Sequence, residues 1–259
     1  MRPNPVKRLL RDGRPAVGTW LNIGSPVTAE AVAALGFDWI VVDTEHSPIG
    51  IETAAAMFQA IGGMGGVPMV RIPANTEEHF KRVLDAGAWG VVVPMVRTAE
   101  EAAAAVAWCR YPPAGKRSMA ASPRHARAFG TDPATYFARA NDEIVLVIQL
   151  EDIDAVRRAD GILKVPGLDA CFIGPTDLSA SMGLKPGYEQ TDPAFEEALR
   201  MVREACKRHG VAPGIHTGSA AALNRRIAEG FQFVALWSDL GFMLQTVRAE
   251  LAKVQRRPA

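Results

Sequence analysis

The chain has 259 residues, of which 48% are hydrophobic and 22% are charged, and its formal net charge is +1. These values are typical of a globular protein with a sizeable core. Without a cluster of Lys or Arg the composition argues against nucleic acid or an anionic membrane as a partner, and no apolar run reaches the length of a membrane span.

Short β-branched runs alternate with longer segments of helical period along the whole chain, which predicts repeated strand–helix units. The predicted strands are Ala16 to Trp20, Trp39 to Val42, Met69 to Ile72, Gly90 to Val93, Val145 to Leu150, Ala170 to Ile173, Ala212 to Ile215 and Phe233 to Leu236. The predicted helices include Thr28 to Leu35, Glu52 to Ile61, Thr76 to Ala86, Ala99 to Cys109, Pro193 to Arg208 and Ser219 to Ala228.

Eight strand–helix units in about 250 residues predict a single-domain (β/α)8 TIM barrel that takes up residues 1–259. A doubly wound open sheet is the alternative. The chain has no glycine-rich dinucleotide-binding turn after its first strand, which disfavours the open sheet.

The longest interruption of the pattern runs from Arg110 to Asp142 and is rich in turn residues and positive charge. It contains Arg117 and the run Arg124 to Arg127. Because it comes after the fourth predicted strand, we expect it to cover the mouth of the barrel, where its arginines would receive an anionic substrate. The alternative is a solvated connecting loop.

Cys109, Cys171 and Cys206 are odd in number, far apart and without zinc-ligand spacing. The first ten residues have only Leu9 and Leu10 as an apolar stretch, which is too little for a signal peptide. We therefore expect reduced, buried cysteines and a cytoplasmic protein.

The most informative polar group follows the second predicted strand, where Asp43, Glu45 and His46 come after Trp39-Ile-Val-Val. Ligands of parallel α/β proteins bind at the carboxyl ends of the strands, so this group is a candidate site. His46 beside Asp43 suits proton transfer near neutral pH. The alternative is that the two carboxylates only terminate a strand.

Glu151 and Asp177 directly follow the fifth and sixth predicted strands, which are neighbours in a barrel. Their carboxylates are suitable ligands for Mg²⁺, Mn²⁺ or Co²⁺, with water and substrate completing the shell. Asp177 alone is equally well explained as a helix cap.

Arg71 ends the third predicted strand and is expected to point into the mouth, where it would hold a carboxylate or a developing enolate oxygen. An ion pair with Asp43 or Glu45 is the alternative. The backbone N–H groups of Thr176 and Asp177 are candidates for an anion nest. No lysine lies at a predicted strand end, so a Schiff-base mechanism is not indicated.

These motifs, taken together and in order, resemble the HpcH/HpaI aldolase family, which comprises metal-dependent (class II) aldolases. The residues that carry the resemblance are Gly18-Thr-Trp20, Asp43-x-Glu45-His46-x-Pro48, Val70-Arg71, Val93-Pro-Met-Val96, Arg110-Tyr-Pro-Pro-x-Gly-x-Arg117, Gln149-x-Glu151 and Gly174-Pro-x-Asp-Leu-Ser-x-Ser-Met-Gly183. The similarity extends over nearly the whole chain.

The resemblance implies reversible cleavage of a 4-hydroxy-2-oxo acid to pyruvate and an aldehyde through a metal-stabilised pyruvate enolate. It also implies a barrel with a swapped C-terminal helix, assembled as a homohexamer. Such enzymes serve the breakdown of aromatic compounds and of sugar acids.

The resemblance further implies roles for individual residues. Glu151 and Asp177 would bind the metal, and His46, paired with Asp43, would act as the base. The substrate-binding residues would be Trp20, Arg71, Gln149, Thr176 and Asp177. Weaker assignments fall on Glu45 and Asp85, which match positions that bind metal-bound water in relatives.

His216 and Trp237 end the seventh and eighth predicted strands, where the aldehyde half of the substrate would bind. They leave the identity of the aldehyde open, and each is also explained as an ordinary loop or core residue. The alternative function on the same site is decarboxylation of an oxaloacetate-like acid or a related carbon–carbon cleavage. A barrel that binds a small acid without turnover is the third possibility.

Overall fold

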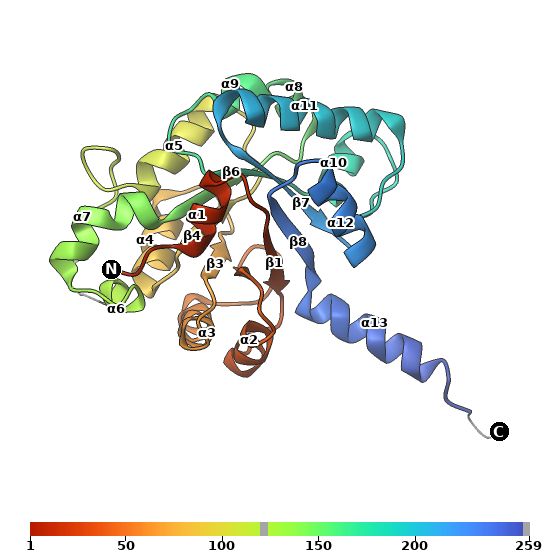
Figure 1. The fold of residues 1–259 in the computed structure, drawn as a ribbon, viewed down its shortest axis with the longest axis horizontal. Helices are drawn as coiled ribbons and strands as arrows, with labels where there is room; N and C mark the ends of the chain where they lie inside the picture. Colours follow the sequence, from red (N-terminus) through yellow and green to blue (C-terminus); the bar gives the residue numbers. More distant parts are fainter. Residues whose placement is uncertain (120–123, 256–259) are drawn as a thin grey trace.

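The structure is a computed structural model that describes residues 1–119 and 124–255. Its centre is a closed barrel of eight parallel strands in chain order, each paired with the next and the last paired with the first (Figure 1). The strands are β1 (Ala16–Leu21), β2 (Trp39–Asp43), β3 (Pro68–Arg71), β4 (Gly90–Val93), β5 (Val145–Gln149), β6 (Ala170–Ile173), β7 (Ala212–Thr217) and β8 (Phe233–Ser238).

Strands β2, β4, β5 and β6 are buried along their whole length. This explains their nearly continuous apolar sequences, because one face fills the barrel interior and the other packs against the outer helices. Within this core Trp39 stacks on Phe233 with ring centroids 4.0 Å apart, and its indole N–H donates to the Ala16 carbonyl at 3.1 Å. A side chain at Gly18 would overlap the Trp39 ring, so this glycine is required by space.

The outer ring consists of one long helix or a helix pair after most strands. Its members are α2 (Pro26–Ala33), α3 (Ile51–Gly63), α4 (Glu77–Ala86), α5 (Ala99–Cys109), α8 (Ile153–Arg157), α9 (Ala159–Leu163), α10 (Pro175–Ser181), α11 (Pro193–His209) and α12 (Ala220–Ala228). The predicted (β/α)8 barrel is thus confirmed, and every predicted strand is present with its ends shifted by at most two residues.

The amino-terminal helix α1 (Pro5–Arg11) lies across the amino ends of β4 and β5. The Asn4 side chain, which caps α1, donates to the carbonyls of Trp89 and Glu143, the residues that precede these strands. Lys7 donates to the Ile144 carbonyl at 2.8 Å. This helix was not predicted, because it has only seven residues and no long apolar stripe, and its polar residue Lys7 is buried by contacts with a distant segment.

The interruption after α5 contains two further helices, α6 (Arg124–Ala128) and α7 (Pro133–Glu143), and the prediction of its position was wrong. A helix that follows a barrel strand returns the chain to the amino end, so the segment after α5 starts at the end of the barrel opposite the mouth. Accordingly, Arg110 donates to the Ile144 carbonyl, just before β5.

The last helix, α13 (Asp239–Leu251), extends away from the barrel (Figure 1). Its large apolar side chains are partly solvent-exposed along its length. They include Leu240, Phe242, Met243, Leu244, Val247 and Leu251. In the part of the chain that the structure describes, no helix is long and apolar enough to cross a membrane.

Candidate functional site

A cavity of about 350 Å³ opens at the carboxyl ends of the strands, where the polar residues of the sequence were expected to meet. It is lined by Trp20, Asn22, Asp43, His46, Arg71, Gln149, Glu151, Phe172, Gly174, Pro175, Thr176, Asp177, Tyr188, His216 and Ser238. Most of the predicted site residues therefore face one space.

The Asp43 carboxylate is fully buried and bound by Arg71 through two parallel hydrogen bonds, from Nε at 2.9 Å and from Nη2 at 2.7 Å. Burial lowers the pKa of Arg71, but the hydrogen bond and charge of Asp43 outweigh it and raise that pKa. The third nitrogen, Nη1, lies 3.0 Å from Glu45 Oε2. A guanidinium has five N–H groups and Asp43 accepts two of them, so Nη1 and Nη2 keep N–H groups that can face a ligand. The ion pair of Arg71 with Asp43 and Glu45 is therefore present, and some of the Arg71 N–H groups still have no acceptor in it.

The His46 side chain lies on the rim of the cavity with 66% of its surface exposed. Its contact with Asp43 is through the backbone, since the His46 N–H donates to Asp43 Oδ1 at 3.4 Å. The imidazole Nε2 lies 3.8 Å from Glu45 Oε2. The expected pairing of the ring with Asp43 is thus not present, because Arg71, Asn22 and two backbone amides already occupy that carboxylate.

Glu151 is buried, and its carboxylate accepts hydrogen bonds from the Met95 N–H and from the Gln149 amide, each at 3.0 Å. Burial raises its pKa to about 7, and the negative charge of Asp177 adds to the rise. A side chain at position 174 would overlap this carboxylate, so Gly174 leaves it room.

A divalent cation fits these residues. Glu151 and Asp177 line the same cavity, no described Lys or Arg forms an ion pair with Glu151, and the buried Gln149 Oε1 has no hydrogen-bond donor within residues 1–119 and 124–255. Two carboxylates are an incomplete set of ligands, and no group of three or more His, Cys, Asp or Glu among these residues is arranged to hold a metal. Water and substrate would complete the shell.

Thr176 and Asp177 lie in the first turn of α10, with Gly174 as its N-cap. N–H groups in this turn have no acceptor inside the helix, and both residues line the cavity. The two residues of the predicted anion nest thus line the same cavity as Glu151.

One wall of the cavity consists of rings. Trp20 lies over the Arg71 guanidinium, 4.7 Å from its central carbon, and 5.7 Å from Phe172 between centroids. His216 lies 6.1 Å from Trp20 and 4.7 Å from Tyr188. Burial, with a smaller contribution from the Arg71 charge, lowers the pKa of His216 to about 3, so its imidazole is neutral at physiological pH.

Trp237 does not line the cavity. The pairing of β1 with β8 shifts register between Gly18 and Trp20, so that Trp20 pairs with Ser238, and Trp237 adopts a left-handed backbone with φ of 48°. Its indole packs instead over Gly241, where a side chain would overlap it. Ser238 takes the place in the cavity that the sequence suggested for Trp237.

Asp85 also lies apart from the cavity within this chain. It is in the last turn of α4, at the amino end of the barrel, where Arg117 binds it at 2.7 Å. The Arg117 side chain is completely buried, with its guanidinium 4.4 Å from the Tyr111 ring. Arg127 lines a different cavity, beside Arg2. The expectation that these arginines cover the mouth was therefore wrong, and the Arg124 side chain lies outside the described residues.

Sequence reasoning missed Asn22 and Tyr188. Asn22 follows β1 and donates to Asp43 Oδ2 and to Ser47 Oγ, each at 3.0 Å. The rule that found Asp43, polarity at the carboxyl end of a strand, would have found Asn22 too. Tyr188 comes from the connection between α10 and α11, where no local signal marks it.

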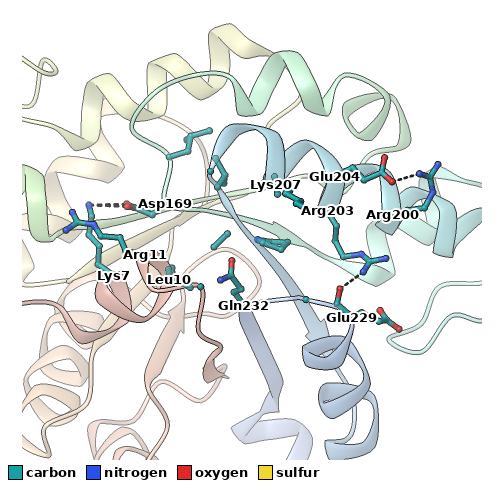
Figure 2. A pocket seen from close by; sticks show the side chains of 18 residues that line it. Lys7, Leu10, Arg11, Asp169, Arg200, Arg203, Glu204, Lys207, Glu229 and Gln232 are labelled. Carbon is teal, nitrogen blue, oxygen red and sulfur yellow. Dashed lines mark hydrogen bonds and ion pairs between the residues drawn. The ribbon is translucent and has the colours of Figure 1, made fainter.

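A larger cavity of about 720 Å³ lies at the amino ends of the strands, between α1 and α11 (Figure 2). Its charges are largely paired: Lys7 with Asp169, Arg200 with Glu204, and Arg203 with the Glu229 carbonyl. In TIM barrels the residues at this end usually contribute to stability and not to catalysis.

The family model described as HpcH/HpaI aldolase/citrate lyase matches residues 16–246. The chain is 37% identical over 252 residues to a 4-hydroxy-2-oxo-heptane-1,7-dioate aldolase of Shigella sonnei, covering 96% of this chain and 94% of the relative. It is 38% identical over 239 residues to a 5-keto-4-deoxy-D-glucarate aldolase of Salmonella paratyphi C, with 92% of each chain covered.

The fold is also similar to the crystal structure of a HpcH/HpaI aldolase/citrate lyase family protein from Burkholderia cenocepacia. The TM-score is 0.90 at 34% identity, over 98% of this chain and all of the other. The protein is a carbon–carbon lyase, and it belongs to the HpcH/HpaI aldolase/citrate lyase family.

Proposed function

We propose that this lyase is a class II aldolase that reversibly cleaves a 4-hydroxy-2-oxo acid to pyruvate and an aldehyde. The observation that carries the proposal is that one small cavity contains a carboxylate-bound arginine, Arg71, and a pair of acidic side chains, Glu151 and Asp177. The two aldolases with related sequences support the reaction type.

In the cleavage direction the hydroxyl proton at C4 is removed, the bond between C3 and C4 breaks, and its electrons move to the C2 oxygen as an enolate. Arg71 is placed to stabilise this charge, since Asp43 fixes the plane of the guanidinium and leaves N–H groups of Nη1 and Nη2 for the oxygen. Trp20 covers one face of the guanidinium, with its ring 4.7 Å from the central carbon. Protonation of C3 then gives the methyl group of pyruvate.

His46 is the proposed base that takes the hydroxyl proton. It lies on the rim, and an imidazole exchanges protons readily near neutral pH. Glu45 Oε2, 3.8 Å from the ring, would stabilise the imidazolium. Burial raises the pKa of this carboxyl, and the charges of Arg71 and His46 oppose that rise.

Glu151 and Asp177 are the proposed ligands of a divalent cation, Mg²⁺, Mn²⁺ or Co²⁺. The cation would supply a fixed positive charge that stabilises negative charge on the substrate. Gln149 lines the cavity, and its orphaned Oε1, an acceptor, would take a hydrogen bond from the hydroxyl group of the substrate. The amides of Thr176 and Asp177 would orient the carboxylate of the pyruvyl group. The role of Asp85 has no support within a single chain.

We further propose that α13 is exchanged between two copies and that the copies assemble into a hexamer. The helix projects from its own barrel and exposes apolar side chains such as Phe242 and Leu244, which a second copy would cover (Figure 1).

The experiment that tests the reaction is release of pyruvate with Mg²⁺ or Mn²⁺ from 4-hydroxy-2-oxoheptanedioate and from 4-hydroxy-2-oxopentanoate, whose aldehyde half is uncharged, measured beside decarboxylation of oxaloacetate. Faster aldol cleavage supports the proposal. Decarboxylation without aldol cleavage would favour the alternative, which uses the same enolate. Pyruvate binding with neither reaction would indicate a barrel without turnover.

A further inference from the structure

The described residues that line the site cavity form a polar group and an aromatic group. The charged and amide groups, among them Asp43, Arg71 and Glu151, form one part, and four rings form the other: Trp20, Phe172, Tyr188 and His216. The proposed function places the pyruvyl half against the polar part, so the aldehyde half has the rings as its neighbours.

The rings form one connected group. Tyr188 and His216 are 4.7 Å apart at an interplanar angle of 34°, and Trp20 and Phe172 lie 6.1 and 6.5 Å from His216. Tyr188 is 47% exposed and forms the outer member of the group. Flat apolar groups bind such surfaces through offset or edge-on contacts.

The charge balance of the described lining disfavours a second carboxylate on the aldehyde. Asp43, Glu151 and Asp177 are three carboxylates, whereas Arg71 is the one guanidinium, and Asp43 and Glu45 already bind it. The His216 imidazole is neutral at physiological pH because its pKa is lowered to about 3. Among the residues described at the ring wall, none offers a free cation.

We infer that the aldehyde partner of this enzyme is a neutral aldehyde with an aromatic group, which packs against the surface formed by Tyr188 and His216. The inference rests on the proposed function. It makes Tyr188 a specificity-determining residue and separates this site from one built for an acid aldehyde.

The test is aldol addition of pyruvate, with Mn²⁺, to benzaldehyde and to 4-carboxybenzaldehyde, two aldehydes with the same ring that differ by one carboxylate. We expect kcat/KM for benzaldehyde to be at least about tenfold higher, the order expected when a charge enters a site without a partner. Equal use of the two aldehydes, or a preference for 4-carboxybenzaldehyde, would overturn the inference.

The variant is Tyr188→Leu, which removes a ring from an exposed position. We expect the ratio of kcat/KM for benzaldehyde to that for acetaldehyde to fall about fivefold, the order of one aromatic contact. Phe37→Leu, a similar change at the other end of the barrel, is the control and should keep the wild-type ratio. An unchanged ratio in Tyr188→Leu would count against the proposed role.

Exchange of the pyruvate methyl protons in D₂O needs no aldehyde. It therefore tests the proposed function separately from the inference about the aldehyde. Exchange in the wild type together with indifference to the aldehyde's charge would refute only this inference. Absence of exchange would refute the proposed function and the inference with it.

Discussion

Arg71 and Asp43 are joined by two parallel hydrogen bonds of 2.9 and 2.7 Å at the mouth of the barrel. Their strands are in register, with Asp43 at the end of β2 opposite Arg71 at the end of β3. Such a two-point contact fixes the plane of the guanidinium as well as its position. A positive charge that is already oriented stabilises a developing anion without further rearrangement.

Replacing Arg71 with Ala should lower kcat by about 10²–10³-fold, the usual effect of removing one preorganised donor to an oxyanion. Arg71→Lys should restore little of it, because a lysine cannot make the two-point contact with Asp43. Mn²⁺ binding, measured by calorimetry, should be retained. Arg82→Ala, an exposed change on α4, is the control, and wild-type turnover in Arg71→Ala would remove Arg71 from the mechanism.

Asn22→Ala should lower kcat about tenfold or more, which corresponds to the loss of one hydrogen bond to a charged group. Asn22 acts through Asp43 and does not itself bind the reacting atoms, so it is a positioning residue. Asn22→Asp should be worse than Asn22→Ala, because it places a second carboxylate beside Asp43. A lower kcat in Asn22→Asp than in Asn22→Ala would show that Asn22 positions Asp43. Equal losses of kcat in the two variants would indicate local misfolding.

Glu151→Gln and Asp177→Asn should each weaken Mn²⁺ binding at least tenfold, since each removes one of two anionic ligands. The measurement is calorimetric titration of Mn²⁺ into protein stripped with EDTA. Asp154→Asn, an exposed change on α8, provides the matched control. Binding as tight as that of the wild type in both variants would exclude this pair as the cation site.

His216 predicts a pH dependence of stability. Its pKa is lowered in the folded state to about 3, so between pH 3 and 6.5 the unfolded chain binds more protons and stability falls as the pH falls. From pH 6.5 to pH 5 the loss attributable to His216 should be about 1–2 kcal/mol. Urea unfolding of the wild type and of His216→Leu at both pH values measures it, and identical pH dependence in the two proteins would contradict the assignment.

Phe242→Asp and Leu244→Asp should reduce the molar mass measured by light scattering, because each places a charge on the exposed apolar face of α13. Leu35→Asp is the control, since Leu35 is 75% exposed at the end of α2. A wild-type mass in both α13 variants would argue against helix exchange.

The sequence was sufficient for the barrel and for most of the cavity because both depend on short-range patterns. Apolar runs of four to six residues mark buried strands, and a polar residue directly after such a run lies at the carboxyl end. This rule placed Asp43, Arg71, Glu151 and Asp177 in one cavity. Whether each has its proposed role is a separate question, which the variants above address.

The positions of the remaining site residues depend on tertiary features that the sequence pattern does not show. A one-residue irregularity between β1 and β8 turned Trp237 away from the mouth and brought Ser238 to it. Asp85 and Arg117 were expected near the site, but Asp85 lies in the last turn of α4 and Arg117 follows α5. Both helices return the chain to the amino end of the barrel, where the two residues bind each other. Tyr188 reaches the cavity from a long connection whose path only tertiary contacts determine.

Deuterium exchange of the pyruvate methyl protons, followed by NMR with Mn²⁺ or Mg²⁺ and with EDTA as the control, measures whether the cavity forms the pyruvate enolate. We expect exchange that requires the cation and is lost in Arg71→Ala, and this half of the reaction needs no aldehyde. No exchange with any of Mg²⁺, Mn²⁺ or Co²⁺, or equal exchange in EDTA, would contradict the proposed function.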